Sequence, residues 1–520
     1  MGMIKRAAAF AALFLFATTT MTLGQDVTLT SRDGSVTVTG DLLGFDGQFY
    51  RVRTEFGELT VDGSGVLCEG PGCPNLQAYV AELDISGAPE IGQLLLPALI
   101  QAFAAQEGLR VEREDESERR FLLELVSKKD NHPVARFYIH LNSSGEGFAD
   151  LLANQTDIVL STREITPDER MLARNAGLGD LAAQGRARVL ALDSLVAIVS
   201  NQNPVNNISM TDLSEIYSGK VTNWKTLGPQ NAPITPYLRS LQSGVGQFTL
   251  RKLRLEGPDR LSEETLFSPR GIGLATGVSV DPFALGLVSR SASLNTKILT
   301  LTGSCGRSLR PTRRNIKTED YPLTAPLFLY LPARRLPKVA RDFLTYTRSP
   351  AAQLVIRRAG FVDQAPEEIV LNFQGDRLAN AFAVAGEEVA LEDVQEMVST
   401  LRKKKRLTTS FRFETGSVRL DAQSRSNVEQ LATALEAGIY DGRELYFVGF
   451  SDGQGDSRAN LEISRRRAVV VRKAVEKAAE TADFNLINVD VLAYGEAMPM
   501  ACDDTAWGRQ VNRRVEVWVR

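Results

Sequence analysis

The sequence predicts a multidomain α/β protein that begins with a small all-β module. Two long regions, residues 78–365 and 406–520, alternate helix and strand patterns, as α/β domains do. Residues 26–75 instead alternate apolar and polar residues between turn signals, which is typical of short strands. A length of 520 residues fits about three domains, at roughly 150 residues each.

Residues 1–24 have the pattern of a secretory signal peptide. Lys5 and Arg6 give a positive start, and the run from Ala7 to Met21 is mostly apolar. The alternative is a membrane anchor, but this run is short for a bilayer core of roughly 30 Å. We therefore expect export to the periplasm and no membrane span.

Composition argues against several classes of function. The net charge of -3 gives no support to a nucleic-acid surface. Two histidines, His132 and His140, are too few for a histidine-built metal site, and the cysteines lack the CxxC spacing of zinc sites. We find no nucleophile elbow and no zinc-hydrolase signature. We therefore expect no metal, no cofactor and no enzymatic activity.

Export permits disulfide bonds among the four cysteines. Cys68 and Cys73 bracket a tight Glu-Gly-Pro-Gly loop, so we expect them to bond to each other. Cys305 and Cys502 lie far apart in the chain, and the sequence leaves their pairing open.

Residues 366–405 are predicted to be a helical linker. Its apolar residues recur at helical spacing: Leu391, Val394, Met397, Val398 and Leu401. A basic run, residues 402–406, follows. It is either the solvated end of the helix or a contact for anionic lipid or wall polymer, and the first is the simpler expectation.

A glycine-rich loop near the C-terminus brings an acid and an arginine together. Asp452 lies in this loop, and a helix is expected to begin near Asp456 or Ser457, which are both good N-caps. Asn460 and Arg467 are two helical turns apart and share one face. An acid that faces an arginine suits a zwitterion, because the acid takes the ammonium and the arginine takes the carboxylate.

The last 115 or so residues resemble the OmpA-like peptidoglycan-binding domain. The motifs are Gly449-Phe-Ser-Asp-Gly-Gln-Gly455, Asn460-Leu-Glu-Ile-Ser-Arg-Arg-Arg467-Ala, Tyr494-Gly-Glu496 and Gly508-Arg-Gln-Val-Asn-Arg-Arg-Val-Glu516. Phe450 and Ile463 depart from the family's usual His and Leu, without removing a polar contact.

The resemblance implies that Asp452 and Arg467 hold the diaminopimelate of the peptidoglycan stem peptide, with Asn460 beside them. The alternative is a structural Asp452–Arg467 salt bridge without a ligand. We expect Arg513 and Arg514 to be structural. The resemblance also implies that the protein is associated with the cell wall and outer envelope.

Residues 78–365 resemble phosphate-type periplasmic solute-binding proteins. The similar segments are Asn203–Trp224, Asp157-Ile-Val-Leu-Ser-Thr-Arg163, Tyr321-Pro-Leu323 and Phe343–Val362. The resemblance implies two lobes that are joined by crossing strands and that close on a ligand in the cleft between them.

The same resemblance implies an oxyanion site built from an arginine, hydroxyl groups and helix N-termini. The candidate residues are Ser143, Ser144, Thr162, Arg239, Ser243 and Gly244. Two places depart from the family: Val245 replaces a threonine, and Ala88 removes a hydroxyl from the first loop. Glu90 in that loop puts a negative charge near the expected anion, which would lower its affinity.

Two classes of function follow from these patterns. The first is a wall-tethered solute-binding protein for phosphate or a related oxyanion. The second is a structural envelope scaffold whose binding domain has lost its ligand. A different small ligand for the cleft is a further alternative.

Overall fold

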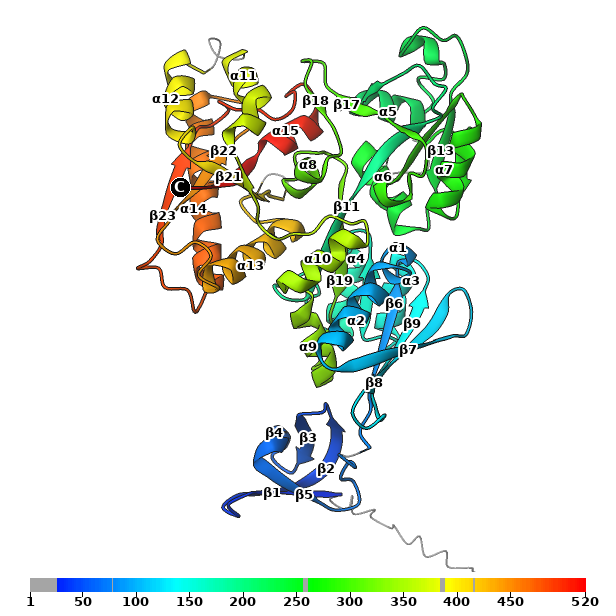
Figure 1. The fold of residues 1–520 in the computed structure, drawn as a ribbon, viewed down its shortest axis with the longest axis vertical. Coiled ribbons are helices and arrows are strands. Elements are labelled where there is room, and N and C mark those ends of the chain that lie inside the picture. The colour runs from blue at the N-terminus through cyan, green and yellow to red at the C-terminus, as the bar shows by residue number, and fades with distance from the viewer. Residues whose placement is uncertain (1–25, 77, 256–260, 384–388, 415–416) are drawn as a thin grey trace, which may run out of the picture. The chain divides into compact units, whose positions relative to one another are not determined.

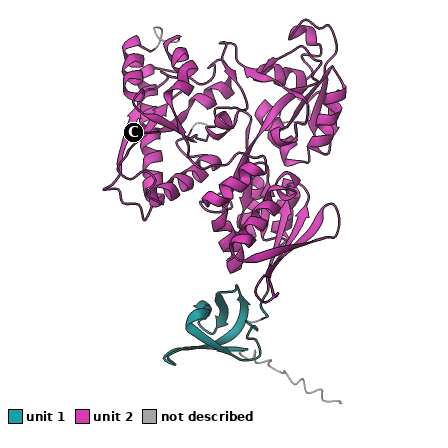
Figure 2. Ribbon diagram, in the orientation of Figure 1, with its two compact units in different colours: residues 1–79 teal, residues 80–520 magenta. Residues whose placement is uncertain are grey.

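The computed structural model describes residues 26–76, 78–255, 261–383, 389–414 and 417–520 (Figure 1). The expected signal peptide, residues 1–24, lies outside the described residues. The chain divides into two compact units, residues 1–79 and 80–520 (Figure 2). Within the described ranges, no helix has the length and apolar character needed to cross a membrane.

The N-terminal unit is the expected all-β module. Its five strands form one antiparallel sheet in the order β4-β3-β2-β1-β5. The strands are β1 (Val27–Ser31), β2 (Thr37–Phe45), β3 (Phe49–Thr54), β4 (Gly57–Asp62) and β5 (Val66–Glu69). A small core contains the buried side chains of Val27, Leu29, Tyr50 and Val52. Cys68 on β5 is bonded to Cys73, and this disulfide closes the loop that follows the strand.

Two lobes form the central domain, and one long strand joins them. Strand β11 (Ala187–Val199) is a run of mostly buried apolar residues. Its residues 187–194 pair with β19 (Thr324–Tyr330) in the first lobe, and its residues 195–199 pair with β15 (Ala284–Ser289) in the second. This is the two-lobed architecture that the sequence predicts. We define the first lobe as residues 80–194 and 324–365, and the second as residues 195–323.

The first lobe places six strands in the order β7-β8-β9-β6-β10-β19. Besides β19 they are β6 (Ala81–Gly87), β7 (Leu109–Asp115), β8 (Arg120–Ser127), β9 (Pro133–Leu141) and β10 (Ile158–Ser161). Its helices are α1 (Pro89–Gly92), α2 (Leu95–Gln106), α3 (Ser144–Leu152), α4 (Pro167–Asn175), α9 (Lys338–Tyr346) and α10 (Pro350–Arg358).

The second lobe continues the sheet through β15, β13 (Thr235–Arg239) and β14 (Leu266–Ser268). A small second sheet holds β12 (Asn207–Ser209), β17 (Thr300–Thr302) and β18 (Ser308–Leu309). The helices are α5 (Met210–Tyr217), α6 (Gly244–Leu253), α7 (Gly271–Val280) and α8 (Arg313–Lys317).

The C-terminal domain has a five-stranded sheet in the order β20-β21-β24-β22-β23. The strands are β20 (Glu368–Ile369), β21 (Lys405–Phe411), β22 (Glu444–Phe450), β23 (Asn488–Ala493) and β24 (Arg514–Val519). Helices α13 (Ala422–Glu436) and α14 (Ser457–Ala478) pack in one core with this sheet. The short helix α15 (Ala506–Asn512), which the sequence analysis missed, precedes β24.

The predicted linker, residues 366–405, is built into the C-terminal domain. It contains β20 and two helices, α11 (Gly375–Ala383) and α12 (Leu391–Leu401). Apolar side chains of α12 share a core with Val448 and Trp518 of the sheet. The apolar spacing of α12 therefore belongs to a helix that packs against the sheet, and not to a free connecting helix.

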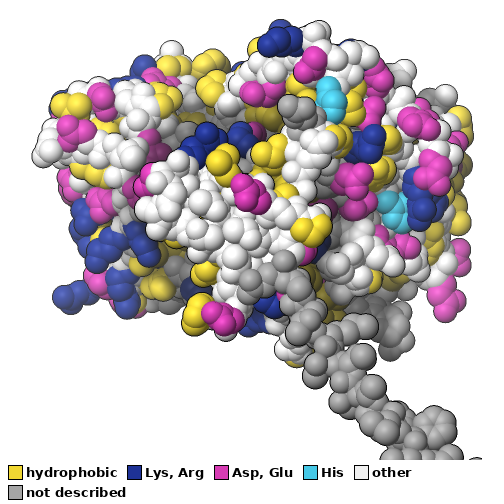
Figure 3. Space-filling model, turned by 90° about the horizontal axis from the view of Figure 1, so that it is seen from below, with side chains coloured by type: hydrophobic (Ala, Val, Ile, Leu, Met, Phe, Trp, Pro, Cys, Tyr) yellow, Lys and Arg dark blue, Asp and Glu magenta, His cyan; other side chains and the backbone are white. Residues whose placement is uncertain are grey.

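The expectation of a solvated basic run is wrong for Lys404 and Arg406, which are both buried. Arg406 is 2% exposed, and its Nη1 lies 2.7 Å from Oδ2 of Asp320. Its Nε also lies 3.3 Å from Oε2 of the buried Glu516. Two carboxylates compensate the arginine charge, so it can leave water. On the face shown in Figure 3, acidic and basic side chains are interspersed.

Candidate functional site

Two of the predicted cleft residues are helix caps. Ser143 caps α3, and its Oγ accepts a hydrogen bond of 3.1 Å from the backbone N–H of Glu146. Ser243 caps α6 in the same way, with Gly246 as the donor at 3.0 Å. The hydroxyl of Ser243 also donates to the carbonyl of Ser240 at 2.6 Å. The proton of this hydroxyl is therefore already used. The N-termini of α3 and α6 still carry the partial positive charge of their helix dipoles.

The two lobes meet closely at three other predicted residues. Ser144 begins α3, Thr162 follows β10, and Gly244 begins α6 on the opposite lobe. A Cβ atom at Gly244 would overlap the hydroxyls of both Ser144 and Thr162. Only glycine lets α6 approach so closely, and the cleft is closed at this point.

Arg239 is paired with an acid from the other lobe. It ends β13, and its Nη2 lies 2.8 Å from Oε1 of Glu90 in the first turn of α1. The side chains are only 9% and 16% exposed. Sequence reasoning expected Glu90 to repel an anion, and the structure adds that its carboxylate is itself the partner of Arg239.

The cleft still contains polar atoms without partners. Among the described residues, Nε of Arg239 and Oγ1 of Thr162 are buried and make no hydrogen bond. Such groups cost free energy unless something satisfies them. A second contact between the lobes was missed in the sequence: Nε of Arg163 donates to Oε1 of Gln247 on α6 at 2.5 Å.

The second candidate site lies where β22 ends and α14 begins. Asp456 caps α14 by accepting from the N–H of Ala459 at 3.0 Å. Asn460 and Arg467 are buried on the same face of this helix, as their spacing predicts. Nδ2 of Asn460 donates to Oε2 of Glu496 at 2.7 Å.

Asp452 and Arg467 do not form the structural salt bridge that was the alternative to a ligand site. Asp452 instead accepts a bond of 2.5 Å from Nη1 of Arg513. Arg513, which was expected to be structural, is thus the ion-pair partner of Asp452. Arg514, in contrast, is buried against Glu516 at 2.7 Å, as a structural residue should be.

Among the described residues, Arg467 forms no direct ion pair with an acid, although the charge of Asp452 acts on it and opposes the lowering of its pKa. Its Cζ lies 5.2 Å from the ring centre of Phe413, and its Nε is buried without a hydrogen bond. Burial, followed by the charge of Arg513, lowers the pKa of Arg467. A buried arginine that makes no direct ion pair keeps hydrogen-bond donors that suit a carboxylate.

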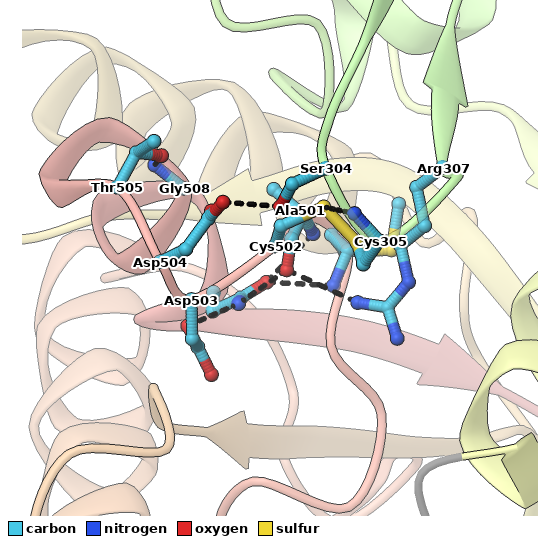
Figure 4. Close-up of a disulfide and its surroundings, with 11 residues drawn as sticks. Ser304, Cys305, Arg307, Ala501, Cys502, Asp503, Asp504, Thr505 and Gly508 are labelled. Atoms are coloured by element: carbon cyan, nitrogen blue, oxygen red, sulfur yellow. Dashed lines mark hydrogen bonds between the residues drawn. A yellow bond between two sulfur atoms is a disulfide. The ribbon is translucent and has the colours of Figure 1, made fainter.

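A disulfide is connected to this site through the residue that follows it, Asp503 (Figure 4). Cys305 and Cys502, whose pairing the sequence left open, are bonded to each other. The next residue, Asp503, accepts a bond of 2.9 Å at Oδ2 from the backbone N–H of Gly453. Gly453 directly follows Asp452, so the disulfide and the candidate loop are neighbours.

The described residues contain no group of three or more His, Cys, Asp or Glu side chains that could hold a metal ion. The two candidate sites instead offer arginines, hydroxyls and backbone N–H groups. This chemistry suits reversible binding of anions and zwitterions.

Two families match this chain. Residues 80–351 match the family described as a PBP superfamily domain, and residues 412–513 match the OmpA family. Protein SphX from Synechococcus elongatus is 25% identical over 264 residues, which cover 47% of this chain and 75% of that protein. The phosphate-binding protein PstS from Borreliella burgdorferi is 23% identical over 225 residues, covering 42% and 76%. An ABC-type phosphate transport receptor from Vibrio cholerae has a TM-score of 0.41 and 21% identity, covering 54% and 99%.

Proposed function

The chain belongs to the PBP superfamily and carries a C-terminal OmpA-family domain, and we propose that it is a periplasmic protein that anchors to peptidoglycan and presents a solute-binding domain. In this proposal Asp452 takes the ammonium of diaminopimelate and Arg467 takes its carboxylate. The role is binding and not catalysis.

The observation that carries the anchor is the unpaired state of Arg467. A buried guanidinium without a carboxylate costs free energy, which a ligand carboxylate would recover. Asp452 and Arg467 supply one group of each sign, as a zwitterion requires. Asp452 already pairs with Arg513, so a ligand ammonium has to displace or share this arginine.

For the cleft, the proposed ligand is phosphate or a related oxyanion. Relatives with matching sequences are named phosphate-binding proteins. The unpartnered Nε of Arg239 and hydroxyl of Thr162 support an anion that accepts from both lobes. Glu90 lowers the affinity, because it competes for Arg239.

The second candidate function is an envelope scaffold with a ligand-free cleft. The Arg239–Glu90 pair favours it, since a carboxylate of the chain itself already satisfies part of the arginine. The engaged hydroxyl of Ser243 points the same way. In that case the domain would serve as a body for other envelope partners.

One experiment tests the anchor, and a second separates the two functions. The purified full-length protein is sedimented with sacculi that contain diaminopimelate and with sacculi that contain lysine at that position. We expect the protein in the first pellet only, and protein that stays in both supernatants would contradict the anchor. Calorimetric titration with phosphate should give heat for a receptor and none for a scaffold.

A further inference from the structure

The disulfide between Cys305 and Cys502 joins two different functional parts of the molecule. Its cysteines are 197 residues apart. Cys305 lies in the turn between β17 and β18 of the second lobe, and Cys502 lies in the loop before α15 of the C-terminal domain (Figure 4). Cys305 is exposed in its turn, whereas Cys502 is buried.

The loop that carries Cys502 also supports the candidate peptidoglycan site. Asp503 accepts from the N–H of Gly453 at 2.9 Å, and from Nδ2 of Asn512 at 2.7 Å. Gly453 follows Asp452, and Asn512 precedes Arg513, the partner of Asp452. One carboxylate thus ties together the two backbone segments that aim the Asp452 side chain.

The second lobe holds this loop through more than the disulfide. Nη1 of Arg307 donates to the carbonyl of Ala501 at 3.0 Å. The backbone N–H of Cys305 lies 3.1 Å from Sγ of Cys502, and the hydroxyl of Ser304 donates to Asp504. Residues 501–504 therefore take much of their support from residues 304–307 of the neighbouring domain.

The C-terminal domain also contacts the first lobe. Arg348, in the turn between α9 and α10 of the first lobe, forms an ion pair with Glu429 on α13. Gln364 accepts from Nε2 of Gln423 at 3.3 Å and from the hydroxyl of Ser426 at 3.2 Å. The domain is consequently braced against both lobes, and the disulfide is its covalent link to the second.

We propose that Asp503 is a positioning residue for the peptidoglycan-binding loop, and that the Cys305–Cys502 bond, supplied in part by the solute-binding domain, fixes its position. This inference rests on the proposed anchor function. Affinity for the stem peptide then depends on the redox state of a bond between domains. A dithiol reductant opens it by thiolate attack on one sulfur. The second thiol of the reductant then attacks the mixed disulfide and releases the protein thiol. In sum, two electrons and two protons pass from the dithiol to the disulfide, and the products are two cysteine thiols and one oxidised dithiol.

The test uses the full-length protein and a synthetic tripeptide, alanyl-γ-glutamyl-diaminopimelate, in calorimetric titrations. In Cys305→Ser/Cys502→Ser we expect affinity to fall about five- to tenfold, because a misplaced loop loses roughly one hydrogen bond's contribution. The matched control is Cys68→Ser/Cys73→Ser, which removes the other disulfide from a separate unit and should bind like wild type. Asp503→Ala should weaken binding with the bond intact, and should add little in the Cys305→Ser/Cys502→Ser background.

A reversible arm removes the question of folding. In the Cys68→Ser/Cys73→Ser background, dithiol treatment should weaken tripeptide binding and reoxidation should restore it. Affinity that stays unchanged on reduction, in a protein whose oxidised form binds the tripeptide, would overturn this inference alone. If the oxidised wild type does not bind the tripeptide at all, both the anchor function and the inference are wrong.

Discussion

Arg239 and Glu90 form an ion pair between the two lobes, with Nη2 of the arginine 2.8 Å from Oε1 of the acid. The arginine ends β13 in the second lobe, and the acid lies in the first turn of α1 in the first lobe. The pair therefore occupies the arginine on which the oxyanion proposal depends and also links the lobes. An entering anion has to displace or share Glu90, so we expect the wild-type protein to bind phosphate weakly.

Replacing Glu90 should strengthen phosphate binding. Glu90→Thr removes the competing carboxylate and supplies a hydroxyl, and we expect about tenfold tighter binding, equivalent to roughly 1.4 kcal/mol. Arg239→Ala should remove binding, because it deletes the guanidinium on which the proposed anion site depends. Calorimetry with phosphate and sulfate measures both effects.

The chain offers a matched control for this experiment. Glu118 and Arg270 also connect the two lobes, but their side chains are 79% and 70% exposed. Exposed ion pairs contribute little, so Glu118→Thr should leave phosphate affinity unchanged. Absence of heat for both wild type and Glu90→Thr would contradict the oxyanion proposal and leave the scaffold function.

The anchor should depend on both charges of the C-terminal site. We expect Asp452→Ala and Arg467→Ala each to weaken retention on sacculi by about ten- to a hundredfold, the contribution of a charge-assisted hydrogen bond. Arg466→Ala is the control, since this neighbour on α14 is exposed and its ion pair with Glu462 is exposed as well. Retention of both site variants at the wild-type level would refute the assignment, provided circular dichroism shows that they fold.

Local patterns in the sequence predicted much of this fold. The spacing of apolar residues marked α12. The N-cap residues Asp456 and Ser457 marked the start of α14. The candidate residues Asp452, Asn460 and Arg467 could be chosen because they lie in one loop and on one helix face. These features depend on neighbours within about two helical turns.

The missed features are contacts between distant parts of the chain. Arg406 meets Asp320 across 86 positions, and Arg513 meets Asp452 across 61. Neither pair leaves a local signal, because each residue type is ordinary in its own segment. Glu90 was noticed as an unusual residue, but its pairing with Arg239 follows from how the lobes close.

The buried ion pair between the domains should be essential to stability. Arg406 and Asp320 have side chains that are 2% and 4% exposed. Burial opposes ionisation of Asp320, but the charge of Arg406 outweighs it, so the pKa of Asp320 is lowered. Asp320→Asn would remove one of the two carboxylates that compensate the buried Arg406, and we expect a loss of about 3–5 kcal/mol in urea unfolding. Asp342→Asn, in an exposed pair with Lys338, should cost less than about 1 kcal/mol. A similar, small loss in both variants would contradict this role.

Stability should also depend on pH through Glu319, which lies near this pair. Burial, and then the charge of Asp421, raises the pKa of Glu319 from 4.5 to about 8. Between these values the folded protein keeps a proton that the unfolded chain has lost, so stability falls as pH rises through this window and stays lower above it.

Glu319→Gln is neutral at every pH and should remove this slope. We expect the variant to match wild type near pH 4.5 and to be more stable at pH 8.5, gaining about 1.4 kcal/mol for each unit of raised pKa. Thermal unfolding at both pH values measures this, with the exposed Glu392→Gln as the control. An equal difference between variant and wild type at the two pH values would show that Glu319 titrates alike in the folded and unfolded chain.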